Sequence, residues 1–202
     1  MKTRKFVFFL TLLTAVLLWD SVQSFSVLGY QWPKGVFKYY INPKNQDIPE
    51  TDVVPAIKKA ARAWNTWCRA RYLGETTMKK TRNDGMNTVF FRRAEYGALA
   101  TTYTFSKGTE ILDVDIVFWD NPWKFYEGIH GCANGFYLTD VATHEFGHAI
   151  GLGHSKSKQA TMYKNCGWCS NEVRTLDTDD KNAASRLYGT PQTTAMILNP
   201  GN

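Results

Sequence analysis

The chain has 202 residues, of which 44% are hydrophobic and 21% charged, with a formal net charge of +6. This length predicts one domain, large enough to bury a real core. The basic residues include scattered pairs such as Lys58-Lys59 and Arg92-Arg93 rather than a stripe, so the charge excludes a nucleic-acid partner.

Residues 1–24 have the pattern of a secretory signal peptide. Three basic residues precede an apolar run at 6–19, and Val22-Gln23-Ser24 offers small or permissive residues for cleavage. The run is short for a bilayer and lacks a basic stop-transfer cluster, and no later stretch approaches transmembrane length. We therefore expect a secreted, extracellular protein without a stable membrane anchor. Its mature chain begins at about Phe25 and keeps a net charge of +4 once the signal's three basic residues and one acidic residue are removed.

The first half of the mature chain predicts strands around one helix. Aromatic and β-branched residues at 35–42 indicate a strand, and so do those at 87–91, 98–105 and 110–119. Between the first two strands, a helix starts at Thr51 or Asp52, with apolar residues at three-to-four spacing as far as Cys68. In the strand 110–119, Asp113 and Asp115 share one face and apolar residues share the other, which predicts a single buried face.

The segment 144–154 contains three of the four histidines, at spacings that suit a metal ion. On a helix capped by Thr139-Asp140, His144 and His148 share a face, with Glu145 beside them. Gly151 can adopt a positive φ, ending the helix and returning His154 as a third ligand. Three protein ligands leave one zinc position open for water, as in catalytic zinc sites. The alternative is a core helix with histidines satisfied by hydrogen bonds, which the third histidine and the helix-ending glycine disfavour.

The four cysteines are Cys68, Cys132, Cys166 and Cys169, and disulfides are the default for an even number in an exported chain. Three pairings are possible. We expect Cys166–Cys169 as a tight loop and Cys68–Cys132 as a long-range bridge. The Cys166-Gly-Trp-Cys169 string also resembles a thioredoxin-type redox motif, but no strand precedes it and a polar turn follows, so a structural bridge is favoured.

The chain ends with an irregular stretch to Arg174, a helix at about 177–188 and a short tail at 190–202 that we expect to be flexible. The order of elements does not repeat a βαβ unit throughout. It indicates an α+β domain with helices packed against a twisted sheet.

These motifs resemble the metzincin zinc-peptidase signature, and in detail its matrixin branch, the family of the matrix metalloproteinases. Ser155 follows the third histidine as in matrixins, and Ala160-Thr161-Met162-Tyr163 is similar to the family's methionine turn. The final helix, with paired aspartates and a terminal Leu-Tyr-Gly, is also similar. The likeness spans most of residues 25–189, which we expect to form the catalytic domain.

The resemblance implies a zincin fold: a twisted, mainly parallel mixed sheet, an active-site helix and a C-terminal helix around a cleft. It implies that Met162 forms an apolar floor under the imidazoles and that Tyr163 lines a substrate pocket. It also implies that the strand 110–119 is the sheet edge that binds an extended substrate. Lys164 stands where the family usually has proline, which predicts a differently shaped specificity pocket. A calcium ion is possible by family analogy, although no loop has a convincing ligand spacing.

The expected function is a monomeric secreted zinc metalloendopeptidase that hydrolyses extended protein or peptide substrates. His144, His148 and His154 would bind one zinc ion, and Glu145 would act as general base toward an activated water. Two alternatives stay open: a binding or toxin-like module on a zincin scaffold, and a protease confined to a single substrate.

Overall fold

A computed structural model of the chain describes residues 24–93, 97–128 and 131–191. All of the predicted signal peptide except Ser24 lies outside these ranges, and so do residues 192–202 of the predicted tail. Among the described helices, none is both long and apolar enough to cross a membrane.

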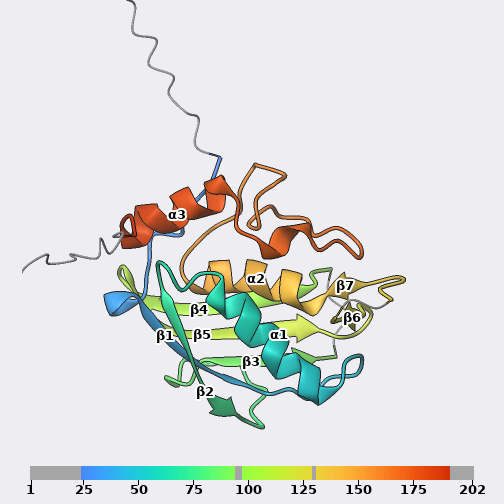
Figure 1. Cartoon of the computed structure of the whole chain (residues 1–202). Helices are drawn as coiled ribbons and strands as arrows, with labels where there is room; N and C mark the ends of the chain where they lie inside the picture. Colours follow the sequence, from blue (N-terminus) through green and yellow to red (C-terminus); the bar gives the residue numbers. More distant parts are fainter. Residues whose placement is uncertain (1–23, 94–96, 129–130, 192–202) are drawn as a thin grey trace, which may run out of the picture.

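The main sheet contains five strands in the order β2-β1-β3-β5-β4. Neighbouring strands are parallel, except that β4 runs antiparallel to β5. The sheet and the helices packed against it (Figure 1) confirm the expected α+β class with a mainly parallel, mixed sheet. The strands are β1 (Val36–Ile41), β2 (Arg69–Glu75), β3 (Thr88–Arg92), β4 (Ala100–Lys107) and β5 (Glu110–Trp119).

The sequence pattern did not predict β2. This strand pairs with β1 at the outer edge of the sheet, and none of its residues is fully buried. Its arginines and glutamate therefore remain in solvent. Exposed and partly buried residues alternate, but the partly buried side holds only Ala70, Tyr72 and Gly74, which is a weak strand signal.

The prediction that β5 buries only one face is wrong. Asp113 and Asp115 are almost fully buried, whereas Leu112 on the opposite face is exposed. The segment before β3 and the first residue of β3 cover the two aspartates: the backbone N–H groups of Arg82 and Thr88 donate to Asp115, and those of residues 84 and 85 donate to Asp113. Backbone donors of this kind offset the cost of burying a carboxylate, and they reach both oxygens of Asp115 but only Oδ2 of Asp113. Alternation alone does not reveal such donors.

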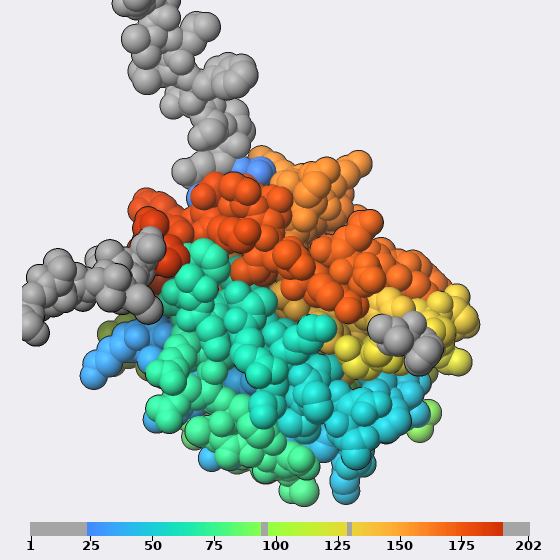
Figure 2. Space-filling model, in the orientation of Figure 1, coloured from blue at the N-terminus to red at the C-terminus, as the bar shows by residue number. Residues whose placement is uncertain are grey.

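Three helices complete the domain: α1 (Glu50–Arg62), α2 (Leu138–Ala149) and α3 (Thr178–Tyr188). α1 and α2 pack against each other on one face of the sheet, and α3 lies beyond α2, farther from the strands (Figure 1). In Figure 2 the chain after residue 151 (orange to red) borders α1 (teal) in this view, and little of α2 is visible between them. The shorter elements are η1 (Pro33–Gly35), β6 (Phe125–Tyr126), β7 (Phe136–Tyr137) and η2 (Glu172–Arg174).

The predicted cap of α2 is wrong. The N-cap is Tyr137, and no side chain caps the helix. Thr139 instead bonds to Glu127, and the buried Asp140 forms an ion pair with Arg174. The two residues therefore hold the start of α2 against loops distant in sequence.

Indole groups fix the position of α2 in the core. Trp64 donates to the Thr143 carbonyl at 2.9 Å, and Trp32 donates to the Ala149 carbonyl at 2.8 Å. The ring of Phe146 packs against the ring of Tyr39 on the sheet. Buried aromatic rings with satisfied N–H groups hold a helix in one orientation.

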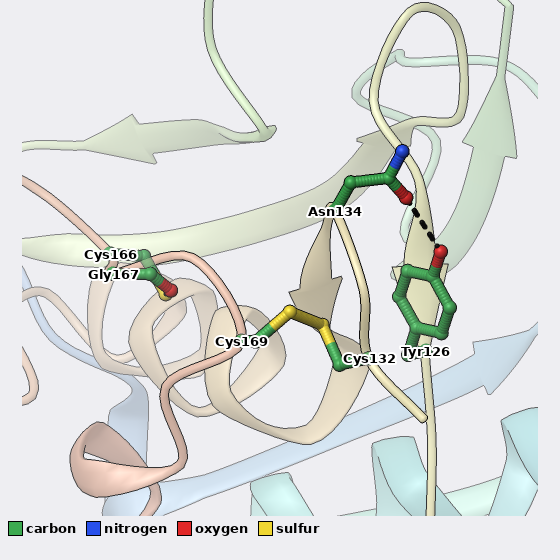
Figure 3. Close-up of a disulfide and its surroundings, with 6 residues drawn as sticks. All are labelled: Tyr126, Cys132, Asn134, Cys166, Gly167 and Cys169. Atoms are coloured by element: carbon green, nitrogen blue, oxygen red, sulfur yellow. Dashed lines mark hydrogen bonds between the residues drawn. A yellow bond between two sulfur atoms is a disulfide. The ribbon is translucent and has the colours of Figure 1, made fainter. Parts of the chain in front are cut away.

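Both predicted disulfides are wrong. The structure pairs Cys132 with Cys169, while Cys68 is a buried free thiol and Cys166 a partly buried one. Figure 3 shows the bridge joining the loop between β6 and β7 to the segment after the methionine turn, with Cys166 apart from it. The partner of Cys169 lies 37 residues away in sequence, so the short Cys166–Cys169 spacing was a misleading guide.

Candidate metal centre

Helix α2 places His144 and His148 one turn apart, and the chain turns sharply after it. Gly151 has φ +99°, and a Cβ at this position would lie 2.1 Å from the backbone oxygen of Tyr30. Glycine is therefore required both by the backbone conformation and by the close approach of another segment. The turn brings His154 back to the two helical histidines.

The three imidazoles converge. One ring nitrogen from each of His144, His148 and His154 lies within 4.8 Å of the other two, and the Nε2 atoms of His148 and His154 are 3.2 Å apart. Two nitrogen ligands of a tetrahedral zinc, each about 2.0–2.1 Å from the metal, are separated by about 3.3 Å. The arrangement fits zinc.

Backbone carbonyls set the tautomers of the two helical histidines. His144 Nδ1 lies 2.7 Å from the Thr161 carbonyl oxygen, and His148 Nδ1 lies 2.8 Å from that of Leu152. A carbonyl only accepts, so each Nδ1 carries the proton and each neutral ring keeps its Nε2 lone pair for a metal.

The three rings are also held in the neutral form. Burial lowers the pKa of His144 to about 4 and that of His148 to about 4. Burial, and secondarily the nearby charge of Lys164, lowers the pKa of His154. At neutral pH the site therefore offers three unprotonated imidazoles, the form that binds metals.

Glu145 lies beside the imidazoles and is 6% exposed. Burial raises the pKa of its carboxyl group. The Thr102 hydroxyl donates to Glu145 Oε2 at 2.6 Å. Sequence reasoning did not identify Thr102, because nothing in the strand pattern separates it from the neighbouring threonines.

The methionine turn packs against α2, the helix that carries His144 and His148. Met162 is 1% exposed, and a Cβ added to Gly147 of α2 would meet the Met162 sulfur at 2.2 Å, so helix and turn are in close contact. The turn is held by Asp180, whose carboxylate accepts from the backbone N–H groups of Thr161 and Met162. Asp180 also completes a capping box with Asp177 at the start of α3. The spacing of Asp177 and Asp180 in the sequence indicates a capping box, but it does not indicate that Asp180 also contacts the methionine turn.

The imidazoles and Glu145 open into a cleft of about 760 Å³. One wall comes from β4 and the segment before it. The other comes from the last residue of the methionine turn, Tyr163, and the chain that follows it, including Lys164 and the free thiol residue Cys166. The expected pocket residue Tyr163 therefore lies at the cleft.

Comparison with known proteins identifies the family, since the matrixin family model matches residues 31–189. The chain belongs to the matrixin family. This matrixin is 29% identical over 179 residues to macrophage metalloelastase of Oryctolagus cuniculus, covering 85% of the chain and 36% of the relative. It is 30% identical over 164 residues to matrix metalloproteinase-20 of Homo sapiens, covering 79% of the chain and 32% of the relative. The chain thus matches about a third of the length of these relatives.

The strand along the cleft in this matrixin is β4. The expectation that residues 110–119 form the sheet edge is wrong, because β5 pairs with β3 on one side and β4 on the other. Within the described residues, β4 pairs only with β5, which leaves its other side open next to α2. The antiparallel return of the chain at Gly108 puts the later strand inside the sheet, an order that strand lengths and composition do not indicate.

Proposed function

We propose that this matrixin is a secreted zinc metalloendopeptidase that cleaves extended protein segments. The observation that carries the proposal is the convergence of His144, His148 and His154 beside Glu145, in a cleft bordered by an open strand edge. The family match and the named metalloproteinase relatives support the same activity.

The residues of the site have separable tasks. The three neutral imidazoles would hold the ion, and their backbone carbonyl partners keep the helical pair oriented. A bound zinc would supply Lewis acidity toward a peptide carbonyl and toward a water molecule. Glu145 accepts the proton of the attacking water and later delivers it to the departing amine. Met162 packs against Gly147 of α2 and takes no part in proton transfer.

The substrate would bind along β4. An extended peptide pairing with the open side of this strand would gain main-chain hydrogen bonds, and the cleft would select its side chains. Tyr163 and Lys164 line the cleft on the wall across from β4, where they would contact the substrate side chain next to the scissile bond. Lys164 is exposed and carries a positive charge into this region.

The remaining expectations concern the whole protein. Secretion rests on the signal pattern of residues 1–24, and the catalytic domain is assigned to residues 25–189. We expect a monomer with one zinc ion. Binding of a calcium ion is supported only by analogy with the family.

Replacement of Glu145 tests the mechanism. Glu145→Ala should retain zinc, because the three imidazoles are untouched, while the turnover number falls by about 10²–10⁴-fold. Metal analysis and cleavage of an unfolded protein substrate provide the two readouts. Glu172→Ala, at an exposed glutamate in η2, is the control and should match the wild type. Near-wild-type cleavage by Glu145→Ala would remove Glu145 from the mechanism.

The alternatives make different predictions in the same experiment. A binding or toxin-like module would bind zinc stoichiometrically and cleave nothing. A protease confined to one substrate would spare generic proteins yet cleave its partner, and that cleavage would still require Glu145.

A further inference from the structure

We propose that Thr102 is a positioning residue for the general base: its hydroxyl orients the Glu145 carboxylate toward the reacting water. This inference rests on the proposed function. Thr102 lies on β4, the strand that borders the cleft, and contacts α2, the helix that carries Glu145. It therefore connects the substrate-binding edge with the proton acceptor.

The contact has the geometry of a strong hydrogen bond. Thr102 Oγ1 lies 2.6 Å from Glu145 Oε2 and 3.2 Å from the backbone oxygen of Glu145. A hydroxyl carries a single proton, and the shorter contact, to the charged oxygen, is the stronger one. Within the described residues, this is the one hydrogen bond that the Glu145 carboxylate makes.

Such a bond matters because the terminal torsion of a glutamate is soft. A carboxylate on this torsion rotates over a broad range unless a partner holds it. Thr102 engages Oε2 and leaves Oε1 without a partner from the described residues, on a side chain that lines the cleft. A general base needs a lone pair within hydrogen-bonding reach of the proton it accepts, so fixing one oxygen presents the other.

Thr102 lies on the same strand that would bind the substrate. The residue pairs with Ile116 of β5 and belongs to the strand whose other side is open. A peptide that adds to this edge is aligned by the same strand that holds Glu145. The scissile bond and the base are therefore placed by one rigid element.

The test compares two substitutions at position 102. Thr102→Val keeps the shape and removes the hydroxyl, whereas Thr102→Ser keeps the hydroxyl. We expect Thr102→Val to lower kcat by about 10- to 100-fold with KM changed by less than about threefold, because the lost bond orients a transition-state group. Thr102→Ser should stay within about threefold of the wild-type kcat. Zinc content should be unchanged in both variants.

A buried threonine remote from the cleft provides the matched control. Thr88 of β3 is 2% exposed, and its hydroxyl donates to the Met86 carbonyl. Thr88→Val removes one threonine hydroxyl bond from the same sheet and should leave kcat unchanged. A general loss of sheet stability would affect both valine variants alike.

A binding measurement separates this inference from the proposed function. The affinity of the zinc-loaded protein for a small hydroxamate depends on a proton acceptor beside the metal, and calorimetry measures it without turnover. Thr102→Val should weaken hydroxamate binding by about tenfold, as one lost bond to a charged group predicts, and Thr102→Ser should restore it. If the wild type cleaves nothing, the proposed function fails, yet this affinity still tests Thr102. Equal kcat and equal affinity in wild type and Thr102→Val would overturn the role of Thr102, and so would a Thr102→Ser variant as impaired as Thr102→Val.

Discussion

At the scale of single residues, the candidate metal centre depends on backbone groups as much as on its histidines. The carbonyls that orient His144 and His148 belong to Thr161 and Leu152, residues that follow α2 in the chain. Sequence spacing identified the histidines because ligand chemistry requires those side chains. It did not identify the carbonyls, because every residue has one and only the fold determines where it points.

Gly151 gives a prediction at this scale. Gly151→Ala should lower the free energy of unfolding of the metal-free protein by about 2 kcal/mol or more, since it combines a positive φ with a backbone clash. It should also weaken zinc binding, because the turn that carries His154 must shift. Denaturant unfolding and a zinc titration measure the two effects.

Gly108 is the matched control. Its φ is +60°, and an added Cβ would meet nothing within 4 Å. Gly108→Ala should cost about 1 kcal/mol from the backbone conformation alone and leave zinc affinity unchanged. Equal effects of the two alanines on stability and zinc binding would contradict the account of Gly151.

At the scale of elements, the sequence predicted where helices and strands lie along the chain better than it predicted which strands pair in the sheet. The helix carrying His144 and the strand 110–119 are present with nearly the expected bounds. β4, and not β5, is the strand at the edge of the sheet, because the tight turn at Gly108 makes β5 run back antiparallel to β4 on its inner side. Pairing order is a long-range property, and the residues of a strand do not encode it locally.

The disulfide between Cys132 and Cys169 gives a prediction at this scale. Cys132→Ser and Cys169→Ser should each lower the free energy of unfolding by about 4 kcal/mol in the chain-entropy account, for a separation of 37 residues. Cys166→Ser, which breaks no bond, should change it by less than about 1 kcal/mol. Denaturant unfolding under non-reducing conditions gives the values. A large loss in Cys166→Ser with none in Cys132→Ser would instead establish the short bridge between Cys166 and Cys169.

At the scale of the whole molecule, buried carboxylates link distant segments and make stability depend on pH. Asp115 is 1% exposed, and burial raises its pKa to about 6. In the unfolded chain the same carboxyl group titrates near 3.8. Between these values the folded state binds more protons than the unfolded state. The contribution of Asp115 to stability is therefore complete below about pH 4 and is lost as the pH rises through 6.

Asp115→Asn isolates this effect because asparagine does not titrate. The stability of the variant relative to wild type should rise by about 2 kcal/mol between pH 4 and pH 7, whatever the constant cost of the changed hydrogen bonds. The histidines titrate alike in both proteins and cancel in the difference. A relative stability that does not change with pH, or that falls as the pH rises, would show that Asp115 does not have a raised pKa.

The same aspartates show where sequence reasoning stopped. Asp113 and Asp115 alternate with apolar residues and so predicted a solvent-facing side for β5. The segment before β3 folds over that side and donates backbone N–H groups to both carboxylates. Thr102 was missed for a related reason, since its role exists only when β4 packs against α2. Composition and spacing thus predicted the fold class and singled out the three histidines that the structure brings together, while contacts between distant segments required the structure.

The most direct test of the zinc-peptidase account is the initial rate of cleavage of an unfolded protein by the chelator-stripped mature chain as zinc is added back. The account predicts no cleavage without metal and a rate that rises linearly to a maximum at one equivalent, because one set of three imidazoles holds the ion. Full activity in the stripped protein, or no cleavage with one zinc bound, would contradict it.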